Sequence, residues 1–94
     1  MIHNQTRYQR KQHLLAAPID DELVLLHVDK GQYYNLKGVG PDLWNRLETP
    51  HSVDELVEWV CEEYDVAKDV ATADVQSFLS ELLEVEAIVI AQEA

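Results

Sequence analysis

Two short runs of alternating residues around a turn constrain the fold of this chain more than any other feature. Leu23–Val28 and Gln32–Leu36 flank Asp29-Lys30-Gly31, which has the composition of a three-residue hairpin loop with glycine at its left-handed position. A loop of three residues would give the hairpin one apolar face. That predicted core face comprises Val24, Leu26, Val28, Tyr34 and Leu36, and the opposite face carries Leu25, His27, Tyr33 and Asn35.

Beyond the hairpin the apolar spacing changes from two to about 3.6 residues, which is typical of helices. A first helix is expected from Pro41, at a first-turn position, to Thr49-Pro50. Ser52-Val53-Asp54-Glu55 has the pattern of a capping box and predicts a second helix that ends near Tyr64. A third helix is expected over about 67–85, with one apolar side. That side comprises Val70, Ala71, Val75, Phe78, Leu79, Leu82 and Leu83.

This order predicts an α+β fold, in which three helices cover one face of a small antiparallel sheet of two or three strands. A further strand is expected at 13–17, and the β-prone segment 87–90 is expected to return to the sheet. We expect one domain over 13–90, preceded by a flexible basic arm at 1–12 and followed by a tail at 91–94.

The charge distribution argues against nucleic acid as a partner. Residues 1–13 carry three of the seven bases and no acid, so the remaining chain holds four bases against 18 acids, a net charge of −14. Such a body repels phosphates. Apolar runs of five residues or fewer cannot span a bilayer, so we expect no membrane association and a cytoplasmic location. Partners of basic character are the alternative to a merely solvating acidic surface.

No motif for catalysis or for a bound cofactor is evident. The four histidines are widely spaced, without the paired ligand spacing of a metal site. Neither a nucleophile elbow nor a phosphate-cradling glycine loop is present. Cys61 lies in an apolar run and is interpreted as a core residue. We therefore predict no catalytic residue, no metal, no cofactor and no enzymatic activity.

The open edge of the hairpin is the candidate binding site. The second strand comprises Gln32, Tyr33, Tyr34, Asn35 and Leu36, and its unpaired edge suits strand addition by an extended peptide. The neighbouring wall would be the third helix, with Ala71, Val75 and Phe78 in a groove and Asp74 near its rim. The alternative interpretation is that both tyrosines are ordinary strand residues. We expect a monomer, with pairing of two copies at this edge as the alternative.

Four segments in this order and spacing resemble the PqqD family of peptide chaperones, also described as RiPP recognition elements. They are Asp29-x-Gly31-x-Tyr33-Tyr34-x-Leu36, Val39-Gly40-x-x-Leu43-Trp44, Ser52-Val53-x-Glu55-Leu56 and Val75-x-x-Phe78-Leu79-x-x-Leu82. The similarity spans roughly residues 14–90. Two positions depart from the family pattern: Lys37 stands where asparagine is common, and Glu86 where glycine often ends the third helix.

The resemblance implies a winged-helix-like fold that binds the leader of a ribosomally made precursor peptide, as an added strand against the third helix. The stand-alone form is most similar to the leader-binding proteins of lasso-peptide biosynthesis, which implies a leader peptidase and a macrolactam-forming cyclase as partners. Three alternatives stay open: a PqqD-type chaperone that delivers a precursor to a radical enzyme in a quinone-cofactor or other RiPP pathway, a winged-helix DNA-binding protein, and a subunit that only stabilises an enzyme.

Overall fold

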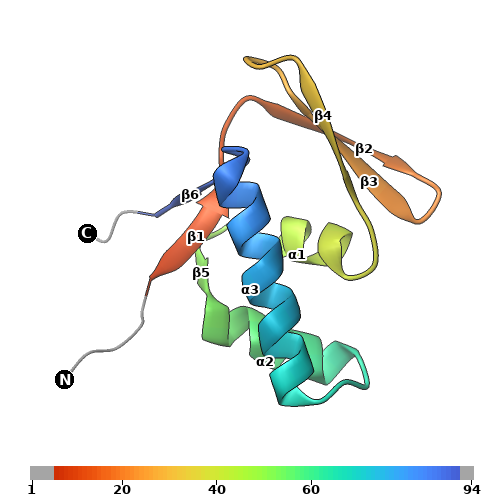
Figure 1. Ribbon diagram of the computed structural model, residues 1–94, viewed down its shortest axis with the longest axis vertical. Helices are drawn as coiled ribbons and strands as arrows, with labels where there is room; N and C mark the ends of the chain where they lie inside the picture. Colours follow the sequence, from red (N-terminus) through yellow and green to blue (C-terminus); the bar gives the residue numbers. More distant parts are fainter. Residues whose placement is uncertain (1–5, 92–94) are drawn as a thin grey trace.

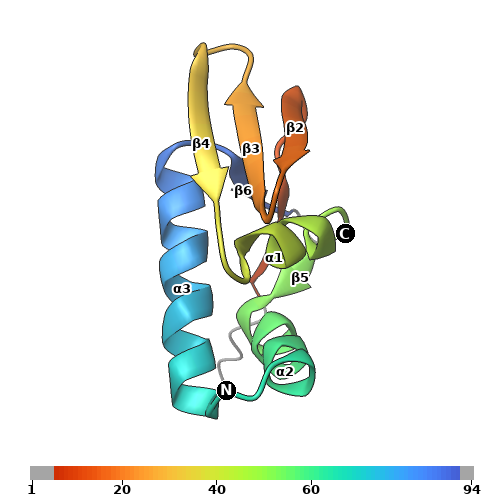
Figure 2. The same cartoon turned by 90° about the vertical axis from the view of Figure 1, so that its right-hand side faces the viewer.

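The predicted hairpin forms two strands of an antiparallel sheet. In the computed structural model, which describes residues 6–91, β3 (Glu22–His27) pairs with β4 (Gln32–Leu36) on one side and with β2 (Leu14–Ile19) on the other. The strand order is therefore β2-β3-β4 (Figures 1 and 2). The predicted strand at 13–17 is present and continues through Pro18, which an edge strand tolerates.

The predicted hairpin register is wrong by one residue. His27 lies opposite Gln32 and Leu25 opposite Tyr34, so the loop has four residues, Val28–Gly31. The N–H of Gly31, at φ +64°, donates to the carbonyl of His27 at 2.7 Å. Because a shift of one residue moves every side chain of a strand to the other face, β3 buries the residues that were expected outside. Leu23, Leu25 and His27 are buried, whereas Val24 and Leu26 are half-buried and Val28 is exposed.

His27 was expected on the face opposite the predicted core and is instead a buried polar side chain. It is only 2% exposed, and within residues 6–91 neither ring nitrogen has a hydrogen-bond partner. Within residues 6–91 the buried polar side chains are His27 and Ser52, and a buried polar group without a hydrogen bond costs free energy.

A second sheet joins the two ends of the described chain. β1 (Arg7–Arg10) is its middle strand, between β5 (His51–Ser52) and β6 (Ile88–Ile90). The expected flexible arm is therefore a paired strand from residue 7, and residues 1–5 lie outside the described part. The predicted terminal strand is present but pairs with β1 rather than with the hairpin. Of the predicted tail, Ala91 donates its N–H to the Arg7 carbonyl at 2.8 Å, and 92–94 are not described.

Three helices follow the first sheet. They are α1 (Gly40–Arg46), α2 (Val53–Glu63) and α3 (Lys68–Glu84), and with the sheets they give the predicted α+β fold. On α3 most of the predicted apolar side is buried or half-buried, but Val70 is exposed. No helix within residues 6–91 is long and apolar enough to cross a membrane.

At the end of α3 a residue other than glycine adopts the left-handed conformation. Glu86 has φ 63°, the left-handed conformation that glycine usually supplies. The N–H groups of Glu86 and Ala87 donate to the carbonyls of Leu83 and Leu82 at 3.1 and 2.8 Å, which closes the helix. The Glu86 carboxylate also lies 3.2 Å from the ammonium of Lys30 in the hairpin loop, and the Lys30 hydrogen bond lowers the pKa of that carboxyl.

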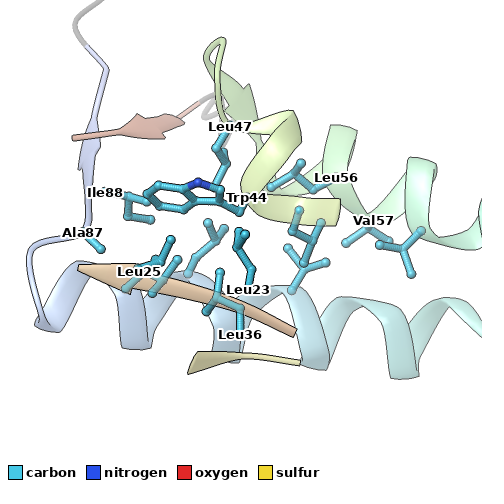
Figure 3. Close-up of a cluster of buried hydrophobic side chains, with 14 of the residues drawn as sticks. Leu23, Leu25, Leu36, Trp44, Leu47, Leu56, Val57, Ala87 and Ile88 are labelled. Atoms are coloured by element: carbon cyan, nitrogen blue, oxygen red, sulfur yellow. The ribbon is translucent and has the colours of Figure 1, made fainter. Parts of the chain in front are cut away.

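The helices and both sheets share one apolar core. Trp44 of α1 is 2% exposed. Figure 3 shows its indole between Ile88 of β6 and Leu56 of α2, beside Leu23 and Leu25 of β3. Burial of an aromatic ring of this size contributes several kcal/mol, so Trp44 makes α1 part of this shared core.

The capping box at the start of α2 generates a stability prediction. The N–H of Glu55 donates to Ser52 Oγ at 3.2 Å, and the N–H of Ser52 donates to Glu55 Oε1 at 2.9 Å, which lowers the Glu55 pKa. Ser52→Ala removes one of these bonds, and we expect it to lower the free energy of unfolding by about 1 kcal/mol in chemical denaturation. Ser80→Ala, at an exposed position of α3, is the control and should change stability little. Equal stability of both variants would contradict the role of the cap.

Candidate functional site

The outer edge of β4 is an open strand edge next to a helix. β4 pairs only with β3, so the main-chain groups of every second β4 residue point away from the sheet. Figure 2 shows this edge on the same side of the molecule as α3. The other edge strand of the sheet, β2, contains Pro18, which has no N–H to donate. β4 is thus the edge better suited to accept a further strand.

A cavity of about 380 Å³ lies where the end of β4 meets α1 and α3. Its apolar lining includes Leu36 and Leu43, both buried, and Phe78, which is half-buried. Polar side chains that line the same cavity come from α3 and from the end of β4. They are Asp74, Ser77, Glu81, Asn35 and Lys37. The cavity can therefore hold one apolar side chain whose neighbours meet polar and charged groups.

Two glycines allow β4, its turn and α1 to approach one another here. Gly38 has φ +60°, which lets the chain reverse from β4 into α1. Gly40, the first residue of α1, lies against the cavity lining: a Cβ added there would meet Leu36 Cβ at 3.1 Å and Phe78 Cε1 at 3.6 Å. The lack of a side chain at residue 40 thus leaves the cavity open on this side.

Four of the predicted contact residues line this cavity: Asn35, Leu36, Asp74 and Phe78. The other predicted residues lie elsewhere. Ala71 and Val75 are fully buried and lie on the side of α3 that packs in the apolar core. Gln32 and Tyr34 lie further along β4, where Tyr34 Oη donates to Gln32 Oε1 at 2.6 Å.

Tyr33 lies on the opposite face of the sheet from Leu36. It pairs with Leu26 rather than with a buried β3 residue, and it is 70% exposed. Leu15 and Ile19 of β2 lie on the same outer face and are 60% and 55% exposed. The Tyr33 side chain therefore belongs to an uncovered apolar sheet face, and only its backbone lies along the β4 edge.

Sequence reasoning missed several lining residues. Ser77 and Glu81 lie three and seven positions after Asp74 and share its helix face, so helical spacing alone was a signal for them. Val39 and Leu43 were named only in a segment that resembles the family, and not as contact residues. Gly40 offered no signal, because its part in the cavity depends on how closely three elements approach.

Within residues 6–91 no group of three or more His, Cys, Asp or Glu side chains could hold a metal ion. The buried His27 has no acid, base or nucleophile hydrogen-bonded to it. The open edge of β4 and the cavity beside it are the candidate site for a polypeptide strand.

Comparison with known proteins agrees with this geometry. The family model described as PqqD, coenzyme PQQ synthesis protein D, matches residues 22–88, from β3 to the first residue of β6. The chain belongs to the PqqD family. This PqqD-family chain matches no protein in a comparison with curated sequences.

Two solved structures share the PqqD-like fold of this chain. The structure of TbiB1 in complex with the TbiA(beta) leader peptide has a TM-score of 0.76 and 34% identity, and covers 92% of this chain and 98% of that one. The structure of lasso peptide synthetase B1 complexed with the leader peptide has a TM-score of 0.76 and 23% identity, and covers 87% of this chain and 96% of that one. At 23% identity the second shows the fold alone.

The turn that leads into the cavity can be tested through Gly38. A Cβ at this position would meet nothing within 4 Å, so a substitution there changes the backbone conformation and not the packing. We expect Gly38→Ala to lower the free energy of unfolding by about 1–2 kcal/mol in chemical denaturation, since a left-handed φ strains L-residues. Gly38→Asn should cost less, because asparagine tolerates this conformation. An alanine variant as stable as the parent would contradict this account of the turn.

Proposed function

We propose that this chain is a non-catalytic recognition element that binds the leader segment of a ribosomally made precursor peptide, as in lasso-peptide biosynthesis. The observation that carries the proposal is the open edge of β4 beside a cavity lined by Leu36 and Phe78. The 34% identity to a protein whose structure contains a leader peptide supports the same assignment.

Binding divides between backbone and side chains. Backbone pairing along Gln32–Leu36 contributes affinity that tolerates changes in leader sequence, since main-chain groups are common to all residues. The cavity sets the register by accepting one apolar leader side chain. A micromolar complex corresponds to about −8 kcal/mol, which a short added strand with one or two buried anchors supplies.

The partners that follow from this role are enzymes that act on the rest of the precursor. We infer a separate leader peptidase and, after it, a macrolactam-forming cyclase, all in the cytoplasm. A chaperone that holds the leader and also contacts an enzyme raises the effective concentration of the cleavage site. No covalent step is assigned to this chain, and we infer that it acts as a monomer because the leader takes the β4 edge.

One alternative has a specific observation in its favour. The description of the matching family model names coenzyme PQQ synthesis. A chaperone of that kind would bind its precursor in the same groove and deliver it to a radical enzyme. DNA binding is disfavoured, because α3 carries one base, Lys68, against four acids.

The proposal is tested by fluorescence anisotropy of a labelled leader peptide, chosen from short reading frames found beside this gene and titrated with the purified protein. We expect saturable binding at micromolar concentration or below, and no binding of a scrambled leader. A folded protein that binds neither peptide, yet still raises the activity of the peptidase, would favour a merely stabilising subunit instead.

Gly40→Ala is the matched variant for the cavity in the same titration. The added methyl group narrows the cavity between Leu36 and Phe78, and we expect affinity for the leader to fall by about tenfold, or about 1.4 kcal/mol. Ser80→Ala, on an exposed part of α3, should bind like the parent. Unchanged leader binding by a folded Gly40→Ala variant would place the anchor elsewhere.

A further inference from the structure

The face of α3 that lines the groove carries a regular pattern of charge. Asp74, Phe78 and Glu81 all line the cavity and lie on one side of the helix. Phe78 is half-buried between the two exposed acids, which lie one helical turn to either side of it. Within residues 6–91 neither carboxylate has an ion-pair partner, and Glu81 only accepts a hydrogen bond from Ser77 Oγ at 3.5 Å.

The single base of the cavity lining does not neutralise these acids. Lys37 Nζ lies 4.0 Å from a carboxylate oxygen of Glu22 on β3 and forms no ion pair with Asp74 or Glu81 within residues 6–91. Asn35, at the end of β4, likewise donates to Glu22, at 3.1 Å. In a chain of net charge −11, the helix side of the groove therefore presents two unpaired negative charges to whatever lies in it.

The spacing of these groups matches that of an extended peptide. Along α3, Asp74 and Glu81 lie about 6 and 4.5 Å from Phe78, at 1.5 Å per residue. In a strand, side chains on one face recur every second residue, about 6.6 Å apart. A strand that runs along α3 with an apolar side chain over Phe78 thus brings its residues two before and two after that side chain near the two carboxylates, within reach of lysine or arginine.

We propose that the groove selects leaders with the pattern basic–x–apolar–x–basic, in which the apolar side chain enters the cavity and the two cations pair with Asp74 and Glu81. This inference rests on the proposed leader binding and specifies its substrate class. The strand pairing is indifferent to sequence, so the three alternating side chains would provide the selectivity. Acidic residues at the two flanking positions are disfavoured, since they would face unpaired carboxylates at close range.

The test uses four labelled versions of the leader peptide. Its anchor is first identified as the apolar residue whose alanine substitution weakens binding most. The residues two before and two after the anchor are then set to Lys/Lys, Glu/Lys, Lys/Glu or Glu/Glu. Each peptide is titrated by anisotropy with the parent protein, Asp74→Lys and Glu81→Lys. Glu62→Lys, an equal change of charge at an exposed site on α2 outside the cavity, is the control.

We expect the parent to bind the Lys/Lys peptide most tightly, with a loss of about fivefold for each glutamate. Asp74→Lys should restore binding of one single-glutamate peptide, and Glu81→Lys should restore the other. Glu62→Lys should restore neither. Which peptide each variant restores also reports the direction of the leader along β4. Asp74→Asn, which removes the charge and keeps the size, should abolish discrimination at one position if the lysine variant does not fold.

Four results would overturn the inference. Equal binding of all four peptides would show that the groove does not select leaders by charge, while leader binding itself would stand. If Glu62→Lys restored binding of the glutamate-containing peptides equally well, the effect would come from the net charge of the protein and not from Asp74 and Glu81. A dimer in sedimentation velocity that Asp74→Lys dissociates, without any effect on the peptides, would assign the groove to a second copy. Failure of every peptide to bind the folded parent would overturn the leader function as well.

Discussion

Burial of Trp44 is the interaction on which the rest of the structure depends. Its indole contacts the core from α1, which lies between the hairpin sheet, the second sheet and the α2–α3 pair (Figure 3). Arg10 of β1 donates from Nε to the Trp44 carbonyl at 3.0 Å, and its guanidinium lies 5.2 Å from the centre of the indole ring. The position of α1 in turn fixes where the end of β4 lies relative to α3, and so creates the groove.

Local signals in the sequence predicted the helices well because the decisive groups are close together in the chain. Ser52 and Glu55 are three residues apart, and both bonds of their capping box are present. Proline in the first turn of α1 is equally local.

The hairpin register was harder to predict, because loops of three and four residues suit the same turn sequence. The choice depends on which face of β3 meets Trp44, and that is a long-range contact. β1 was missed for a similar reason: a polar segment becomes a strand through partners more than forty residues away.

The site could be predicted in outline only. The edge strand and the helix beside it followed from the hairpin and from apolar periodicity, and Asp74 and Phe78 do lie at the cavity. Tyr33, the most prominent candidate, points to the outer sheet face, since β-strand alternation separates it from its neighbour Tyr34. The part played by Gly40 depends on how closely α1 approaches the end of β4, since a Cβ added at residue 40 would lie 3.1 Å from Leu36 Cβ. A pattern of residue types does not reveal such an approach.

The central claim is that a leader peptide pairs with the outer edge of β4, and residue-resolved amide hydrogen exchange tests it most directly. With saturating leader peptide, the account predicts slower exchange at alternate residues of Gln32–Leu36, because their N–H groups gain a strand partner. The open edges of β2 and β6 should exchange as before. Protection along β2 or β6, or unchanged exchange throughout β4 with the leader bound, would contradict the claim.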